Sequence, residues 1–186
     1  MSGIVMPRAV PTKPALADSD MIHTMTDTPA NLLCKACGLC CSGHLFAWVR
    51  LDANELDKVE KLGLKVIRDD PRQRGFLQPC AVWDGTCTVY TSPDYPRSCA
   101  RYKCKQFKEL AEEKTSLPEA MGKIQHAHGL IRELANLLPA SQTVSFRERL
   151  LTKMEDRSAE NDEFRDKAQR LISYFEDFFG VMHFFD

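Results

Sequence analysis

The chain has 186 residues and a hydrophobic fraction of 44%, enough for one domain of ordinary size with a buried core. Basic and acidic side chains nearly cancel, 25 against 26, which gives a formal net charge of −1. This balance provides no indication of a nucleic-acid partner or an anionic membrane partner. No run of 18 apolar residues occurs, so we predict no transmembrane helix, and the proline-containing N-terminus lacks the apolar stretch of an export signal.

Residues 1–30 are rich in Pro, Thr, Asp and Ala without sustained periodicity, and this composition predicts a disordered arm. Residues 31–105 hold every cysteine, and we predict that they form a metal-binding region with short strands. Residues 106–186 show helical patterning and are expected to pack on that region. The predicted fold class is therefore α+β, mainly α.

Within the cysteine region, residues 44–51 (HLFAWVRL) form a short apolar run that predicts a strand. A helix is expected next, because Asp52 is a good N-cap, Glu55 follows three residues later and Gly63 is a suitable stop. Residues 64–67 indicate a second short strand.

An Asp84-Gly85 pair between apolar runs predicts a tight hairpin turn. Its return strand is expected at residues 86–91, followed by a loop at 92–96. Residues 99–113 then predict one continuous helix.

Two capping boxes mark helix starts in the last part of the chain, one beginning at Ser116 and the other at Ser145. Apolar residues follow the first box at helical spacing, and Pro139 is expected to end that helix. A last helix is predicted to end at Gly180. The segment 181–186 is apolar enough to dock on the core or on a partner, docking on the core being preferred. These signals predict a three-helix segment.

All eight cysteines fall in one stretch of the sequence. In a reducing compartment such as the cytoplasm, where we expect this protein, clustered cysteines act as metal ligands or redox centres more often than as structural disulfides. Thiols used only for packing would not gather in this way. The predicted metal ligands are Cys34, Cys37, Cys40, Cys41, Cys80, Cys87, Cys99 and Cys104.

The first run, CKACGLCC, has the spacing C-x2-C-x2-C-C. Ferredoxin-type chains use C-x2-C-x2-C to supply three ligands to a four-iron cluster, with a fourth cysteine from elsewhere. The same run contains Cys34-x2-Cys37-Gly38, the two-ligand knuckle common in zinc sites. Spacing alone leaves both metals open.

Cys40 and Cys41 are adjacent, and consecutive side chains diverge, so two neighbouring thiolates rarely serve one mononuclear metal. One hypothesis assigns them to different centres. Another leaves the second thiol as a spectator or an acid–base group. Eight cysteines are enough for two four-thiolate sites, although nothing in the sequence requires both.

In the second run, Cys99 and Cys104 would be displaced by about 140° on a single helix. They can therefore meet one metal only if a helix begins between them. Several cations stand near the cysteines, where they either offset thiolate charge or simply solvate the surface. These cations are Lys35, Arg97, Arg101, Lys103 and Lys105.

The segments CKACGLCC, CAVWDGTCTVY and YPRSCARYKC together resemble the CxxCxxCC family, the zinc- or iron-chelating domain of YkgJ-type cysteine-cluster proteins. The resemblance runs from Cys34 to Cys104, about two-fifths of the chain. It implies metal chelation by the eight cysteines and says little about biological role. One departure is Pro96-Arg97, which stands where the family usually has Arg-Pro.

The other candidate residues also have ordinary structural explanations. His44 is either a nitrogen ligand or, as we prefer, a loop histidine. His126 and His128 lie roughly 200° apart on the predicted helix, so they cannot chelate one metal together. Trp48 and Trp83 are expected to pack over the cysteine region.

Three hypotheses for function follow. The first is a binding or electron-transfer module that holds one iron–sulfur cluster, which we prefer, or one to two zinc ions. The second is an enzyme or enzyme accessory in which a non-ligating cysteine such as Cys41 does chemistry; no phosphate-binding, dinucleotide-binding or serine-hydrolase fingerprint accompanies it. The third is a structural zinc domain whose helices bind another protein.

Overall fold

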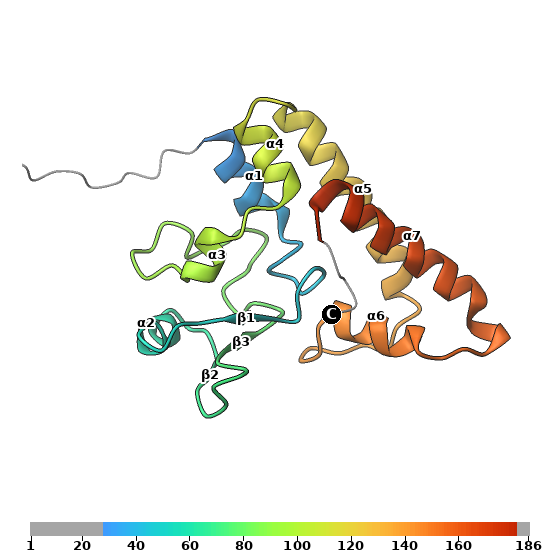
Figure 1. Ribbon diagram of the computed structural model, residues 1–186, viewed down its shortest axis with the longest axis horizontal. Coiled ribbons are helices and arrows are strands. Elements are labelled where there is room, and N and C mark those ends of the chain that lie inside the picture. Colours follow the sequence, from blue (N-terminus) through green and yellow to red (C-terminus); the bar gives the residue numbers. More distant parts are fainter. Residues whose placement is uncertain (1–27, 182–186) are drawn as a thin grey trace, which may run out of the picture.

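The computed structural model describes residues 28–181, and it has the predicted class, α+β and mainly α (Figure 1). Short elements make up the first part of the described chain and longer helices make up the second. In chain order the elements are α1 (Pro29–Cys37), β1 (Trp48–Arg50), α2 (Leu56–Lys61), β2 (Val66–Ile67), β3 (Gly75–Leu77), α3 (Arg97–Arg101), α4 (Lys105–Ala111), α5 (Leu117–Ala135), α6 (Phe146–Met154), the 3₁₀ turn η1 (Ala159–Asn161) and α7 (Asp162–Phe179).

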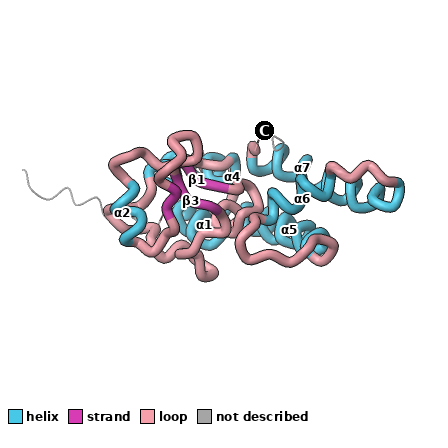
Figure 2. Tube along the Cα trace, turned by 90° about the horizontal axis from the view of Figure 1, so that it is seen from below, coloured by secondary structure: helices cyan, strands magenta, loops and turns pink. Residues whose placement is uncertain are grey.

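The sheet and the long helices lie at opposite ends of the molecule in both views (Figures 1 and 2). Helices α5, α6 and α7 pack together at one end, and the sheet with α2 lies at the other. Helices α1 and α4 pack on each other and also reach the long helices, because α1 contacts α5 and α4 contacts both α5 and α7. We use "cysteine region" for residues 31–105 and "helical region" for residues 106–181.

Buried apolar side chains form two separate clusters. The large core joins the inner faces of α5, α6 and α7 to Leu33, Leu39 and Leu45 of the cysteine region. The small core consists of Leu51, Val59, Leu64 and Phe76. The cysteine region therefore contributes to both cores, while the helical region contributes only to the large one.

The sheet is small and antiparallel, with strand order β1-β3-β2. Phe76 of the central strand faces Val49 on one side and Val66 on the other, and its side chain is almost fully buried in the small core. Strand β3 was not predicted from the sequence. The predicted strands at 44–51 and 64–67 exist only as the short β1 and β2.

The predicted capping boxes are confirmed. The Ser116 and Ser145 hydroxyls accept hydrogen bonds from the N3 backbone N–H groups, and the Glu119 and Glu148 carboxylates accept from the N-cap N–H groups in return. Gly180 ends α7 in the left-handed conformation, as expected. No helix among the described residues is long and apolar enough to cross a membrane.

Some local predictions are wrong. Helix α1 begins at Pro29, inside the segment predicted to be disordered, because the Thr28 side chain accepts a hydrogen bond from the Asn31 N–H group and proline is favoured in the first turn. The rest of the predicted arm, 1–27, lies outside the described residues. The Asp84-Gly85 turn is present, but a single bridge between Trp83 and Cys87 replaces the predicted return strand.

The predicted helix 99–113 is broken. Tyr102 adopts an extended conformation, with φ −68° and ψ 122°, and this ends α3. Cys104 is also extended and caps α4, its sulfur accepting a hydrogen bond from the Phe107 N–H group at 3.4 Å. A helix thus begins after Cys99, which is the condition under which Cys99 and Cys104 can point to a common space.

Candidate metal centre

Six of the eight cysteines line one cavity of about 80 Å³ between α1, α3 and the start of α4. Apolar side chains from α1, α4, α5 and α7 complete its walls, together with the rings of Tyr95 and Tyr102. We call this space the sulfur cavity. Its six cysteines are Cys34, Cys37, Cys40, Cys41, Cys99 and Cys104.

The first four cysteines reach the cavity because α1 stops abruptly. Cys34 and Cys37 are one helical turn apart on α1, so they lie on the same face. Gly38 then adopts a left-handed conformation (φ 71°) and begins the turn that carries Cys40 and Cys41. A Cβ atom at Gly38 would lie 2.3 Å from Cζ2 of Trp83, so the turn requires glycine.

The adjacent residues Cys40 and Cys41 both line the sulfur cavity, but different thiols surround them. Cys40 packs against the large core, as do Cys37 and Cys104. The Cys41 backbone is tied to the second cysteine run, because its carbonyl oxygen accepts a hydrogen bond of 2.7 Å from the Cys80 N–H group.

Packing on the two cores separates five of the cysteines, and the electrostatic influence among the thiols extends the division to the other three. The α1 group is Cys34, Cys37, Cys40 and Cys104, of which all but Cys34 pack against the large core. The hairpin group is Cys41, Cys80, Cys87 and Cys99, of which Cys80 and Cys99 pack against the small core. The grouping exchanges Cys41 and Cys104 between the two runs seen in the sequence.

Electrostatic influence among the thiols follows the same division. Burial raises the pKa of Cys40, and the strongest further influences on it come from Cys37 and Cys104. Burial also raises the pKa of Cys41, where the strongest thiol influences come from Cys80 and Cys87. Cys34 lies at the border, because it is influenced by Cys104 and also by Cys87.

The pKa values of all eight thiols are raised, mainly by burial, and those of Cys37 and Cys99 reach about 12. Thiols in such a setting are neutral near pH 7, and a bound cation is needed to convert them to thiolates. All eight are free thiols rather than disulfides. A soft, thiol-lined and partly apolar cavity suits zinc or an iron–sulfur cluster by the chemistry of its donors.

The thiols are gathered but not preassembled. Among residues 28–181, no three or more His, Cys, Asp or Glu side chains are placed so that they could hold a metal ion as they stand. Binding would therefore require the sulfur atoms to draw closer together.

The cations near the cysteines have different roles. Lys103 lowers the raised pKa of Cys34, and Lys35 does the same for Cys87. Arg97 instead pairs with Asp52 at 3.0 Å and donates its backbone N–H to the buried Glu55 carboxylate at 2.8 Å. That arginine therefore ties α3 to the start of α2 rather than facing a thiol.

The histidines lie around the cavity without lining it. The His44 ring packs edge-on against His128 and Phe146, and burial lowers its pKa to about 4. His128 has Nε2 3.0 Å from the carbonyl oxygen of Cys37, while the His126 ring lies against Tyr174. The two α5 histidines thus diverge, in agreement with the expectation that they do not chelate jointly.

Sequence reasoning missed the tyrosines of the site. Tyr95 and Tyr102 line the cavity, and Tyr90 is a hydrogen-bond partner of Cys34 while its hydroxyl donates to Asn31. Their position among the last four cysteines was the only signal available. Of the two tryptophans, Trp83 packs on the Gly38 turn, and Trp48 is 36% exposed on β1.

Comparison with known proteins gives no relatives. No family model matches the chain, and neither the curated proteins nor the solved structures include a match.

Proposed function

We propose that this protein is a cysteine-ligated metal-binding module, with an iron–sulfur cluster as the preferred cofactor and zinc as the alternative. The observation that carries the proposal is the convergence of six cysteines, from α1, the turn after it, α3 and the cap of α4, on one buried cavity. Burying that many thiols in one place has no evident packing advantage over burying leucine or valine.

The iron–sulfur preference is supported by the α1 group. Three of its members come from the C-x2-C-x2-C run, and the fourth, Cys104, comes from a distant part of the chain and packs on the same core. This is the ligand arrangement of many four-iron clusters. The resemblance to the CxxCxxCC family supports metal chelation in general, and eight free thiols fit a reducing compartment such as the cytoplasm.

The hairpin group is proposed as a second set of ligands. Cys41 is assigned to it because the strongest thiol influences on its raised pKa come from Cys80 and Cys87, so the adjacent cysteines would serve different centres. Under this assignment no cysteine is left over for separate chemistry, and the enzyme hypothesis loses its candidate residue.

The proposal is tested by anaerobic purification followed by metal analysis and a visible spectrum. Iron and sulfide with broad visible absorption are expected, since thiolate-bound iron–sulfur clusters are coloured. Colourless protein with stoichiometric zinc would replace the preferred cofactor by the alternative. Protein that takes up neither metal, even after anaerobic reconstitution, would refute the function.

Paired variants test the two groups. Cys37→Ser should remove the metal of the α1 group, and Cys80→Ser that of the hairpin group, so each variant keeps part of the wild-type metal content. Ser42→Ala, in the same turn, is the matched control and should keep all of it. If either cysteine variant loses all metal while remaining folded, the two groups form a single centre.

A further inference from the structure

A pocket of about 450 Å³ lies directly beside the sulfur cavity and is lined by four cations and no carboxylate. Arg101 comes from the end of α3, Lys103 from the linker, and Lys105 and Lys108 from α4. The remaining lining residues are Tyr102, Cys104, Phe179 and Gly180. We call this space the basic pocket.

The positive charge of the basic pocket is poorly neutralised within the described chain. Lys105 donates to the carbonyl oxygen of Asp177 at 2.8 Å and lies 3.9 Å from the Glu109 carboxylate. Lys103 stands 4.2 Å from the centre of the Phe107 ring. Within residues 28–181, no carboxylate oxygen lies within 4.0 Å of the charged nitrogens of Arg101, Lys103 or Lys108.

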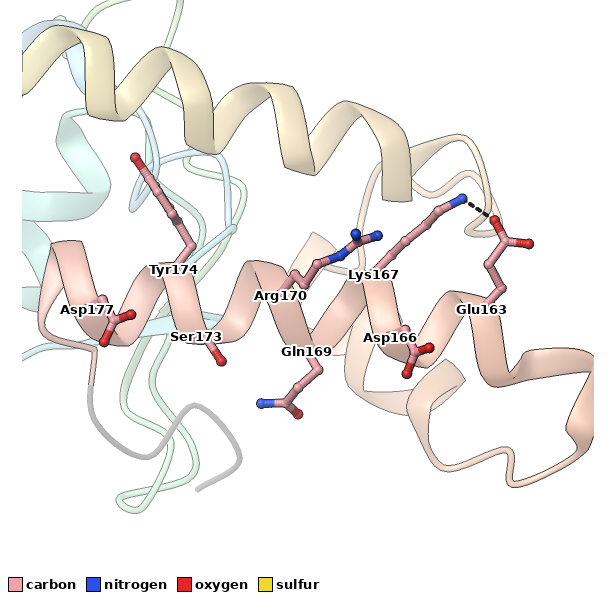
Figure 3. Close-up of a pocket in the computed structure, with 8 residues that line it drawn as sticks. All are labelled: Glu163, Asp166, Lys167, Gln169, Arg170, Ser173, Tyr174 and Asp177. Carbon is pink, nitrogen blue, oxygen red and sulfur yellow. Dashed lines mark hydrogen bonds and ion pairs between the residues drawn. The ribbon is translucent and has the colours of Figure 1, made fainter.

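Some other surface cations of this protein are paired with carboxylates, in contrast to those of the basic pocket. The guanidinium of Arg68 pairs with both Asp57 and Glu60. A larger open pocket along α7 mixes the two signs of charge, and its Lys167 pairs with Glu163 at 2.6 Å (Figure 3). A pocket with charges of one sign selects for a ligand of the opposite sign, and a mixed pocket does not.

The basic pocket and the sulfur cavity share a wall. Tyr102 and Cys104 line both spaces, so a molecule in the basic pocket is next to the sulfur that caps α4. The rings of Tyr102 and Phe179 add apolar surface beside the cations, a combination more typical of protein contacts than of sites for small inorganic anions.

We propose that the basic pocket docks an acidic segment of a partner protein and holds that partner against the Cys104 wall of the candidate metal centre. That the partner exchanges electrons or metal with the centre rests on the proposed function, whereas the docking itself rests only on the charge and position of the pocket. A nucleic-acid partner is disfavoured, because the cations are confined to one pocket in a chain of net charge −1.

The docking is tested with a fluorescent octaglutamate peptide as the probe, using the full-length protein as purified and fluorescence anisotropy. The double variant R101E/K108E should weaken binding at least tenfold and should abolish most of its salt dependence. The matched control is K61E/K65E, which changes two exposed lysines and alters net charge by the same amount. Carbodiimide cross-linking should join the peptide to Lys103, Lys105 or Lys108.

Each contrary result would rule out a different part of the proposal. Equal loss of binding in both double variants, or no binding by the wild type, would overturn the pocket assignment. Inorganic phosphate is added at a concentration that supplies the same amount of negative charge as the peptide. If it displaces the peptide, the pocket is a small-anion site and the proposal of a protein partner is refuted. Metal analysis of the same preparations separates these outcomes from failure of the proposed function, since peptide binding does not require the metal.

Discussion

The helical region and the cysteine region are stabilised in different ways. Helices α5, α6 and α7 bury a continuous apolar surface, including Leu171 and Phe175, which are 0% exposed. Apart from the leucines that it adds to the large core, the cysteine region has a small core of four buried side chains. Its loops are tied together by single hydrogen bonds such as that from the Cys87 N–H group to the Lys35 carbonyl oxygen. The contrast indicates that one end of the molecule is stable through packing, and it predicts that the other depends on the metal proposed for its thiols.

The largest expected effect comes from removing the metal. Structural zinc contributes roughly 10–16 kcal/mol in zinc-finger peptides, and a site gathered but not preassembled should show the same coupling of binding to local order. Chelation should therefore remove hydrogen-exchange protection from residues 80–104 while the amides of α5 and α7 stay protected. Equal loss at both ends would contradict the contrast.

Truncating the large core should have the next largest effect. Leu171→Ala leaves a cavity between packed helices and should lower the free energy of unfolding by about 2–5 kcal/mol, measured by urea denaturation. Leu137→Ala, at a side chain 43% exposed, is the control and should cost less than about 1 kcal/mol. The loss at Leu171 should be the same with and without metal.

Acid should weaken the junction between the two regions through His44. The pKa of this ring is lowered to about 4 in the folded protein, so between about pH 6.5 and 4 the unfolded chain binds the extra proton. Stability is therefore present above pH 6.5 and is lost as the pH falls toward 4, by roughly 3 kcal/mol in all.

The contribution of His44 is measured as the difference between wild type and His44→Leu in denaturation at pH 7 and pH 4.5. The His44→Leu variant should lose part of the acid dependence. The control is His126→Gln, which changes a histidine on the same helix as His128, the ring that contacts His44, and it should keep the full acid dependence. An unchanged pH profile in His44→Leu would show that this ring does not carry the effect.

Removing a helix cap should have the smallest effect. Ser145→Ala deletes the hydroxyl that accepts from the Glu148 N–H group at 3.1 Å and should cost about 1 kcal/mol. Because α6 belongs to the helical region, the thermal midpoint should fall while the metal content stays constant. Loss of metal in this variant would mean that the two regions are more tightly coupled than proposed.

The helical region was the more predictable of the two because its signals are local. Ser116 and Ser145 stand beside the residues they cap, and the helical period of the apolar residues spans several turns. In the cysteine region, by contrast, the fate of 99–113 depends on the extended backbone at Tyr102 and on Cys104 acting as a cap, neither of which periodicity reveals.

The members of the candidate site were predictable, but their arrangement was not. Residue type and spacing pointed to all eight cysteines, and the structure brings six of them to one cavity, Cys40 and Cys41 included. The pairing of Cys104 with the α1 cysteines depends on contacts between segments some 70 residues apart in the sequence. The tyrosine walls and the contact of His128 with the Cys37 carbonyl depend on similarly distant packing, for which one sequence provides no signal.

The most direct test of the central claim is X-ray absorption spectroscopy at the metal edge of the purified, metal-loaded protein. A thiolate-bound centre predicts a first shell dominated by sulfur, with about four sulfur ligands per metal at about 2.3 Å. A first shell dominated by nitrogen or oxygen would show that the cysteines do not hold the metal, and would contradict the account.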